Sequence, residues 1–184
     1  MRVIGIDPGS RSCGYGVLES NNGDLKHVVS GAITPPVSCN LSKRLKIIYS
    51  SLTEIIHLHS PQYMSIEEMF FAKNAKSAIK LGQARGVAIL AAEIAGLQIY
   101  EYAPTKVKLA VTGSGRAKKF EIMKMVSYVL GIDDFEKSDI SDALAIALCH
   151  INISKHPDLS GLDIKSRSGR KRTRFTINDI TSKR

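Results

Sequence analysis

The first 34 residues alternate short apolar runs with turn residues, a pattern that is typical of neighbouring antiparallel strands. We expect strands over residues 2–7, 15–18 and 28–34. Asp-Pro-Gly-Ser at positions 7–10 and Asn-Asn-Gly-Asp at positions 21–24 supply the turn residues between them. The pattern therefore predicts a meander of three strands.

From residue 41 the apolar positions change to helical spacing. One buried face is predicted over residues 41–59, where apolar side chains recur at Leu41, Leu45, Ile48, Leu52 and Ile55. Pro61 ends this helix. Two further strands (64–67 and 97–102) and four further helices (about 74–95, 105–111, 118–130 and 139–153) follow, with Gly96 as a C-cap. The order predicts an α/β fold, a mixed five-stranded sheet with helices on both faces.

Charge divides the chain into two parts. Of the net charge of +9, residues 155–184 carry +6, with nine Lys or Arg against three Asp, and the preceding residues carry +3. We expect one domain over residues 1–155 and a basic, mostly disordered tail over residues 156–184, where hydrophobic periodicity is lost. The charge indicates a polyanionic partner, either nucleic acid or a membrane surface. The tail could contact nucleic-acid phosphates, dock a protein or only aid solubility.

Neither export nor a membrane span is expected. Asp7 interrupts the first apolar run, so no signal peptide is predicted, and the apolar stretch 86–97 is too short to span a bilayer and contains Glu93. A cytoplasmic location fits three widely spaced cysteines outside any CxxC pattern, which are Cys13, Cys39 and Cys149.

Carboxylates stand at the ends of two predicted strands. Asp7 ends the first strand, although it could instead cap the Pro-Gly turn. Glu67 and Glu68 end the fourth, and because strand side chains alternate, at most one of them faces the same way as Asp7. Periodicity does not choose between the two glutamates, and a solvated acidic strand end is the alternative.

Two more carboxylates open the last helix. Asp139 and Asp142 lie on one helical face at i, i+3 spacing. They could simply favour the helix dipole, with Ser138 or Asp139 as the N-cap. However, residues 143–148 are apolar almost all round, which predicts a buried helix in which Asp142 requires a metal or a partner.

Four such carboxylates suit Mg²⁺, with Mn²⁺ as a substitute, and no Cys/His cluster offers a zinc site. Two ions in one site can support hydrolysis of a phosphodiester. A nuclease is therefore the favoured interpretation. Sugar kinases and ATPases of the actin type, which need a second phosphate loop, and a binding module without activity are the alternatives.

Four blocks, at residues 4–10, 66–70, 80–86 and 139–145, together resemble the RuvC family of crossover junction endodeoxyribonucleases, and the likeness runs over residues 1–153. The resemblance implies a ribonuclease H-like fold, a homodimer, Mg²⁺-dependent symmetric nicking of four-way junctions, and cooperation with the RuvA–RuvB branch-migration complex. It also selects Glu67 over Glu68, where the family more usually has a neutral residue. The tail lies outside it.

Residue roles follow from the resemblance. It implies that Asp7, Glu67, Asp139 and Asp142 hold the metal, that Phe70 stacks on junction bases, and that Lys108 and Lys119 lie near the scissile phosphate. Phe70 could instead belong to the core. Further DNA-binding candidates are Lys73, Lys76, Lys80 and Arg85, the three lysines sharing a helical face that could also be merely solvated. Gly82 and Gly86 form a small-residue stripe, for which packing within the chain is favoured over a dimer contact.

Overall fold

The structure is a computed structural model that describes residues 1–68 and 75–155, the side chains of residues 75 and 76 excepted. Five strands form one mixed sheet in the order β3-β2-β1-β4-β5. They are β1 (Arg2–Asp7), β2 (Cys13–Asn21), β3 (Asp24–Ile33), β4 (Tyr63–Glu67) and β5 (Gln98–Tyr102). The first three pair antiparallel, whereas β1, β4 and β5 run parallel. The predicted mixed sheet is confirmed.

Strands β2 and β3 are longer than predicted because their hairpin is tight. Asn22 and Gly23 both have positive φ, 49° and 101°, as a two-residue hairpin turn of this hand requires. Pairing therefore extends to Asn21 and Asp24 beside the turn. The polar residues at these strand ends lack the apolar alternation on which the prediction relied.

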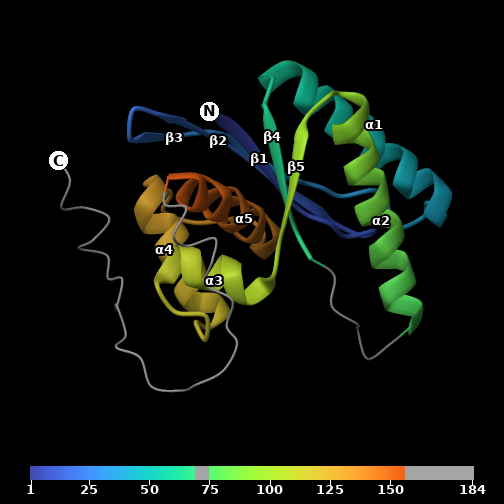
Figure 1. Ribbon diagram of the computed structural model, residues 1–184. Helices are drawn as coiled ribbons and strands as arrows, with labels where there is room; N and C mark the ends of the chain where they lie inside the picture. The colour runs from blue at the N-terminus through green and yellow to red at the C-terminus, as the bar shows by residue number, and fades with distance from the viewer. Residues whose placement is uncertain (69–74, 156–184) are drawn as a thin grey trace.

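Five helices cover the two faces of the sheet (Figure 1). Helices α1 (Leu41–His59) and α2 (Ala75–Ile94) lie on one face, and α3 (Pro104–Thr112), α4 (Lys119–Leu130) and α5 (Ser138–Lys155) lie on the other. The bounds of α1 match the prediction. Its first turn is capped by the Asn40 side chain, which accepts a hydrogen bond of 3.0 Å from the Lys43 N–H, and Pro61 follows its end.

Helix α5 is buried along most of its length, as its apolar sequence predicted. It lies very close to β1 and β2 because glycines face it. A Cβ on Gly5 would lie less than 3.0 Å from the carbonyl oxygen of Ala143 and 2.7 Å from the Ala147 nitrogen. A Cβ on Gly14 would meet the carbonyl oxygen of Asp139 equally closely. Real Cβ atoms do not approach backbone this way, so these positions require glycine.

Some predictions lie outside the described residues, namely those on Phe70, Lys73 and the tail over residues 156–184. The interpretation of Gly86 as an intrachain packing position is wrong. Gly86 is exposed, and a Cβ added there would meet no atom within 4 Å. Within the described residues, no helix is long and apolar enough to cross a membrane.

Gly14→Ala is expected to lower the free energy of unfolding, because its Cβ meets the backbone of Asp139 rather than a movable side chain. Overpacking typically costs ~1–3 kcal/mol, and we expect the upper end of that range. Denaturant unfolding measures the loss. Gly86→Ala is the matched control and should be neutral or stabilising by up to ~1 kcal/mol. Equal losses in both variants would contradict the close approach of α5.

Candidate active site

The ends of β1 and β4 bring two carboxylates to one edge of the sheet. These strands are parallel neighbours in which Ile6 pairs with Ile66, so Asp7 and Glu67 follow at the same level. Residues 3–6 of β1 and 64–66 of β4 are buried, whereas Asp7 and Glu67 at the strand ends are half-buried. The sheet therefore presents Asp7 and Glu67 side by side where its core ends.

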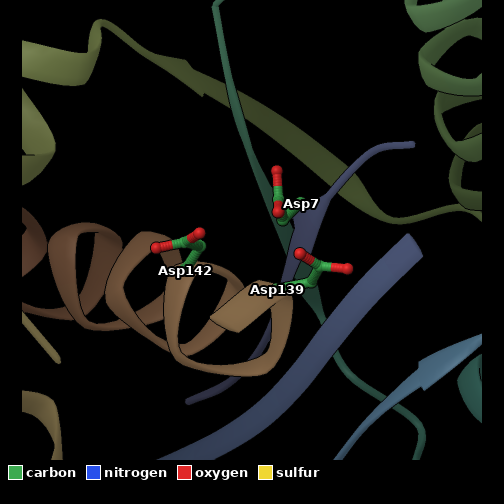
Figure 2. Close-up of side chains that lie close together, drawn as sticks. All are labelled: Asp7, Asp139 and Asp142. Atoms are coloured by element: carbon green, nitrogen blue, oxygen red, sulfur yellow. The ribbon is translucent and has the colours of Figure 1, made fainter. Parts of the chain in front are cut away.

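The N-terminal part of α5 adds two more carboxylates, Asp139 and Asp142. Figure 2 shows both side chains near Asp7, which lies at the end of β1. One carboxylate oxygen from each of the three lies within 4.8 Å of the others. All three residues are half-buried. The i, i+3 spacing thus places both helix carboxylates on the face turned toward the sheet, as predicted.

A hollow of about 300 Å³ opens beside this cluster. It is lined by carboxylates, lysines and the apolar wall of α3, α4 and α5, and its charged residues are Asp7, Glu67, Lys108, Lys119 and Asp142. Glu68 is exposed and does not line it, and its backbone N–H donates a 2.9 Å hydrogen bond to the Tyr102 carbonyl. The geometry therefore places Glu67, rather than Glu68, in the hollow.

Burial and mutual repulsion raise carboxyl pKa values in this hollow. The pKa of Asp7 rises to about 7, first because burial disfavours its charged form and then because Asp142, Asp139 and Glu67 repel it. Burial, followed by repulsion from Asp142, also raises the pKa of Glu67. The cluster thus holds more negative charge than its own lysines neutralise, which favours a bound cation.

Two lysines predicted from the resemblance lie at the same hollow. Lys119 Nζ donates a 2.5 Å hydrogen bond to Asp142 Oδ2, with 61% of the Lys119 side chain exposed. Burial would lower the pKa of Lys119, but this hydrogen bond and the surrounding carboxylates outweigh it, so the pKa is raised. Lys108 lies on α3 beside the hollow. Its positive charge partly offsets the rise in the pKa of Glu67.

The other predicted DNA contacts are distributed differently. Lys80 is exposed on α2. The Arg85 guanidinium is instead bonded to the carbonyl oxygen of Glu67 and to Glu101. The sequence analysis did not identify Glu101. A signal was present, because Glu101 lies two residues after Ile99 and so shares the face of β5 that α2 covers. The Lys76 side chain lies outside the described residues.

The donor chemistry indicates which cation fits. Within residues 1–68 and 75–155, the three aspartates are the one group of His, Cys, Asp or Glu residues close enough to hold an ion. Glu67 lines the adjoining hollow. An all-carboxylate set selects hard cations such as Mg²⁺ and Mn²⁺ over zinc, which favours Cys and His. Such a site could support hydrolysis of a phosphate ester.

Comparison with known proteins identifies close relatives. The family model described as "Crossover junction endodeoxyribonuclease RuvC" matches residues 3–150. The RuvC of Caldanaerobacter subterraneus is 46% identical over 151 residues, which is 82% of this chain and 92% of that protein. The RuvC of Hahella chejuensis is 44% identical over 172 residues, covering 94% of this chain and 99% of its own.

A solved structure gives the same answer for the fold. The "T. thermophilus RuvC in complex with Holliday junction substrate" is 33% identical, with a TM-score of 0.80, and the match covers 85% of this chain and 96% of that chain. The predicted ribonuclease H-like fold is therefore confirmed.

The metal-free protein is expected to lose thermal stability as the pH rises from about 4 through about 7. Asp7 binds its proton more tightly in the folded chain, so its ionisation favours unfolding. A divalent cation should restore stability at pH 8. Melting curves with EDTA or Mg²⁺, on wild type and Asp7→Asn, measure both effects. The substitution should flatten the pH dependence and remove much of the stabilisation by metal, and identical profiles for the two proteins would contradict this.

Proposed function

The chain belongs to the RuvC family of crossover junction endodeoxyribonucleases, and we propose how its carboxylates and lysines carry out that activity. It is a structure-specific endonuclease that resolves Holliday junctions in recombination and repair. The observation that carries our proposal is the convergence of Asp7, Asp139 and Asp142 beside the hollow that Glu67 lines. A binding module without activity would leave this repulsive cluster unexplained.

We assign metal binding to Asp7, Glu67, Asp139 and Asp142, with two Mg²⁺ ions per site and Mn²⁺ as a substitute. Bound divalent ions activate water and stabilise the leaving oxygen of a phosphodiester. The chain's own part is to hold the four carboxylates on the rigid ends of β1, β4 and α5. Cleavage in this way leaves a 3′-hydroxyl and a 5′-phosphate.

The lysines act on the DNA. Lys119 is mostly exposed and pairs with Asp142, so it can shift toward a phosphate and neutralise its charge without crossing the core. Lys108, which lines the same hollow from α3, is proposed to position the strand. Phe70 is proposed to stack on unpaired junction bases. Lys73, Lys76 and Lys80, which are spaced in the sequence at helical intervals, are proposed to contact a phosphate backbone.

Asp7→Asn, Glu67→Gln, Asp139→Asn and Asp142→Asn should each reduce junction cleavage by more than ~100-fold, beyond the 10–100-fold typical of changes around the ligands of a metal. Junction binding should persist because the basic surface is unchanged, and loss of negative charge favours it. Cleavage of a synthetic four-way junction and gel-shift binding separate the two effects. An Asp142→Asn protein that nicks at the wild-type rate would exclude Asp142 from the mechanism.

We further propose a two-fold homodimer with one active site per subunit, because a four-way junction presents two strands related by symmetry. Helix α2 offers a face for it. Ile79, Leu90 and Ile94 are 62%, 52% and 64% exposed on this helix. Three free cysteines are compatible with a reducing cytoplasm. Cooperation with RuvA–RuvB is proposed on family membership alone.

Leu90→Glu should therefore weaken self-association. A buried hot-spot side chain contributes ~2 kcal/mol or more, counted twice in a symmetric interface. Sedimentation at micromolar concentration should show a dimer for wild type and a shift toward monomer for the variant. Leu58→Glu, on the exposed surface of α1, is the matched control and should remain dimeric. Wild-type protein that is monomeric both free and junction-bound would rule out the dimer.

A further inference from the structure

Arg85 reaches from α2 to the end of β4, on the opposite side of the sheet from α5. Its Nε donates a 3.3 Å hydrogen bond to the backbone carbonyl of Glu67, and its Nη2 forms an ion pair with Glu101 on β5. The Arg85 side chain is only 15% exposed. The guanidinium is therefore committed to the protein rather than presented to solvent.

The bonded carbonyl belongs to a peptide group that is held at both ends. The carbonyl of Glu67 and the N–H of Glu68 share one planar peptide unit. Arg85 bonds the carbonyl, and the Tyr102 carbonyl accepts the N–H at 2.9 Å. Together these contacts fix the orientation of the peptide that follows Glu67, and hence the direction in which the strand ends.

This restraint acts at the end of β4, where Glu67 pairs with Tyr102 of β5 as the last pair between the two strands. Glu67 is the last residue of β4, and its side chain must face the hollow against the repulsion of Asp142. A fixed backbone limits the directions in which the Glu67 side chain can turn away from these neighbours. Ligand groups bind metal well only when surrounding hydrogen bonds fix their orientation.

The Arg85–Glu101 ion pair has little value as a stabilising surface contact. The Glu101 side chain is 48% exposed, and ion pairs in contact with solvent contribute little to the free energy of unfolding. Its geometric effect is larger, because the carboxylate of Glu101 holds the planar guanidinium in the position from which Nε meets the Glu67 carbonyl.

We propose that Arg85 is a positioning residue that holds Glu67 in place for metal binding, with Glu101 orienting its guanidinium. The inference rests on the proposed role of Glu67 as a metal ligand. It replaces direct DNA contact as the role of Arg85, because the guanidinium is largely buried and its Nε and Nη2 are already bonded to the protein.

The test compares the Mg²⁺ dependence of cleavage with junction binding, using Arg85→Gln, Glu101→Gln and Glu67→Gln in the full-length protein. Loosening Glu67 should raise the Mg²⁺ concentration at half-maximal cleavage by ~10–100-fold in Arg85→Gln, the range for residues that orient a ligand. Glu101→Gln should shift it in the same direction, although it removes a negative charge and so favours DNA. Junction affinity in EDTA should stay within about threefold of wild type for both variants.

Glu101→Gln separates the two roles even if Arg85→Gln fails to fold. Freeing a DNA-binding arginine from Glu101 would tighten junction binding and leave the Mg²⁺ midpoint unchanged, and this result would overturn the inference. An unchanged midpoint in a folded Arg85→Gln protein, with weaker binding and a flatter salt dependence, would overturn it as well. If Glu67→Gln cleaves normally, the proposed ligand role of Glu67 fails. If Glu67→Gln is inactive while the other two variants match wild type, only the role of Arg85 fails.

Discussion

The close contact of α5 with the glycines of β1 and β2 positions most of the active site. Gly14 pairs with Asp7 in the sheet and lies directly beneath the backbone of Asp139. One glycine therefore joins the strand carboxylate to the helix that carries the other two. Gly5 and the small residues Ala143 and Ala147 continue this contact along α5. Any side chain at these positions would separate the helix from the sheet and disperse the carboxylates.

This arrangement concentrates negative charge in a half-buried place. Burial and repulsion raise the pKa of Asp7 to about 7, and among the described residues one ion pair, between Lys119 and Asp142, offsets the charge directly. Without metal, the same carboxylates that are proposed to act in DNA cleavage therefore lower the stability of the folded protein. Such opposition between stability and local charge is characteristic of functional sites. Backbone restraints, as at Glu67, hold side chains that repulsion would otherwise disperse.

Hydrophobic patterning predicted the layers because α1 buries one regular face, whereas α5 is apolar almost all round and is buried along most of its length. Helical spacing also placed Asp139 and Asp142 on one side of α5, since residues at i and i+3 share a face in any α-helix. Patterning did not distinguish Glu67 from Glu68, because the direction of a strand's last residue depends on pairing with its neighbours. The partner of Arg85 was unpredictable for the same reason, because Glu101 meets it only after β5 adds to the sheet. The close approach at Gly14 could not be predicted, because the sequence does not show which helix crosses β2.

The packing of α5 against the sheet brings these carboxylates together, and we expect the four of them to form one divalent-metal site. Anomalous diffraction from crystals soaked in Mn²⁺ tests it most directly. We expect anomalous peaks in contact with Asp7, Glu67, Asp139 and Asp142, and these peaks should vanish or weaken in crystals of Asp7→Asn. Manganese bound elsewhere, with no peak among these side chains in the wild-type protein, would contradict the account.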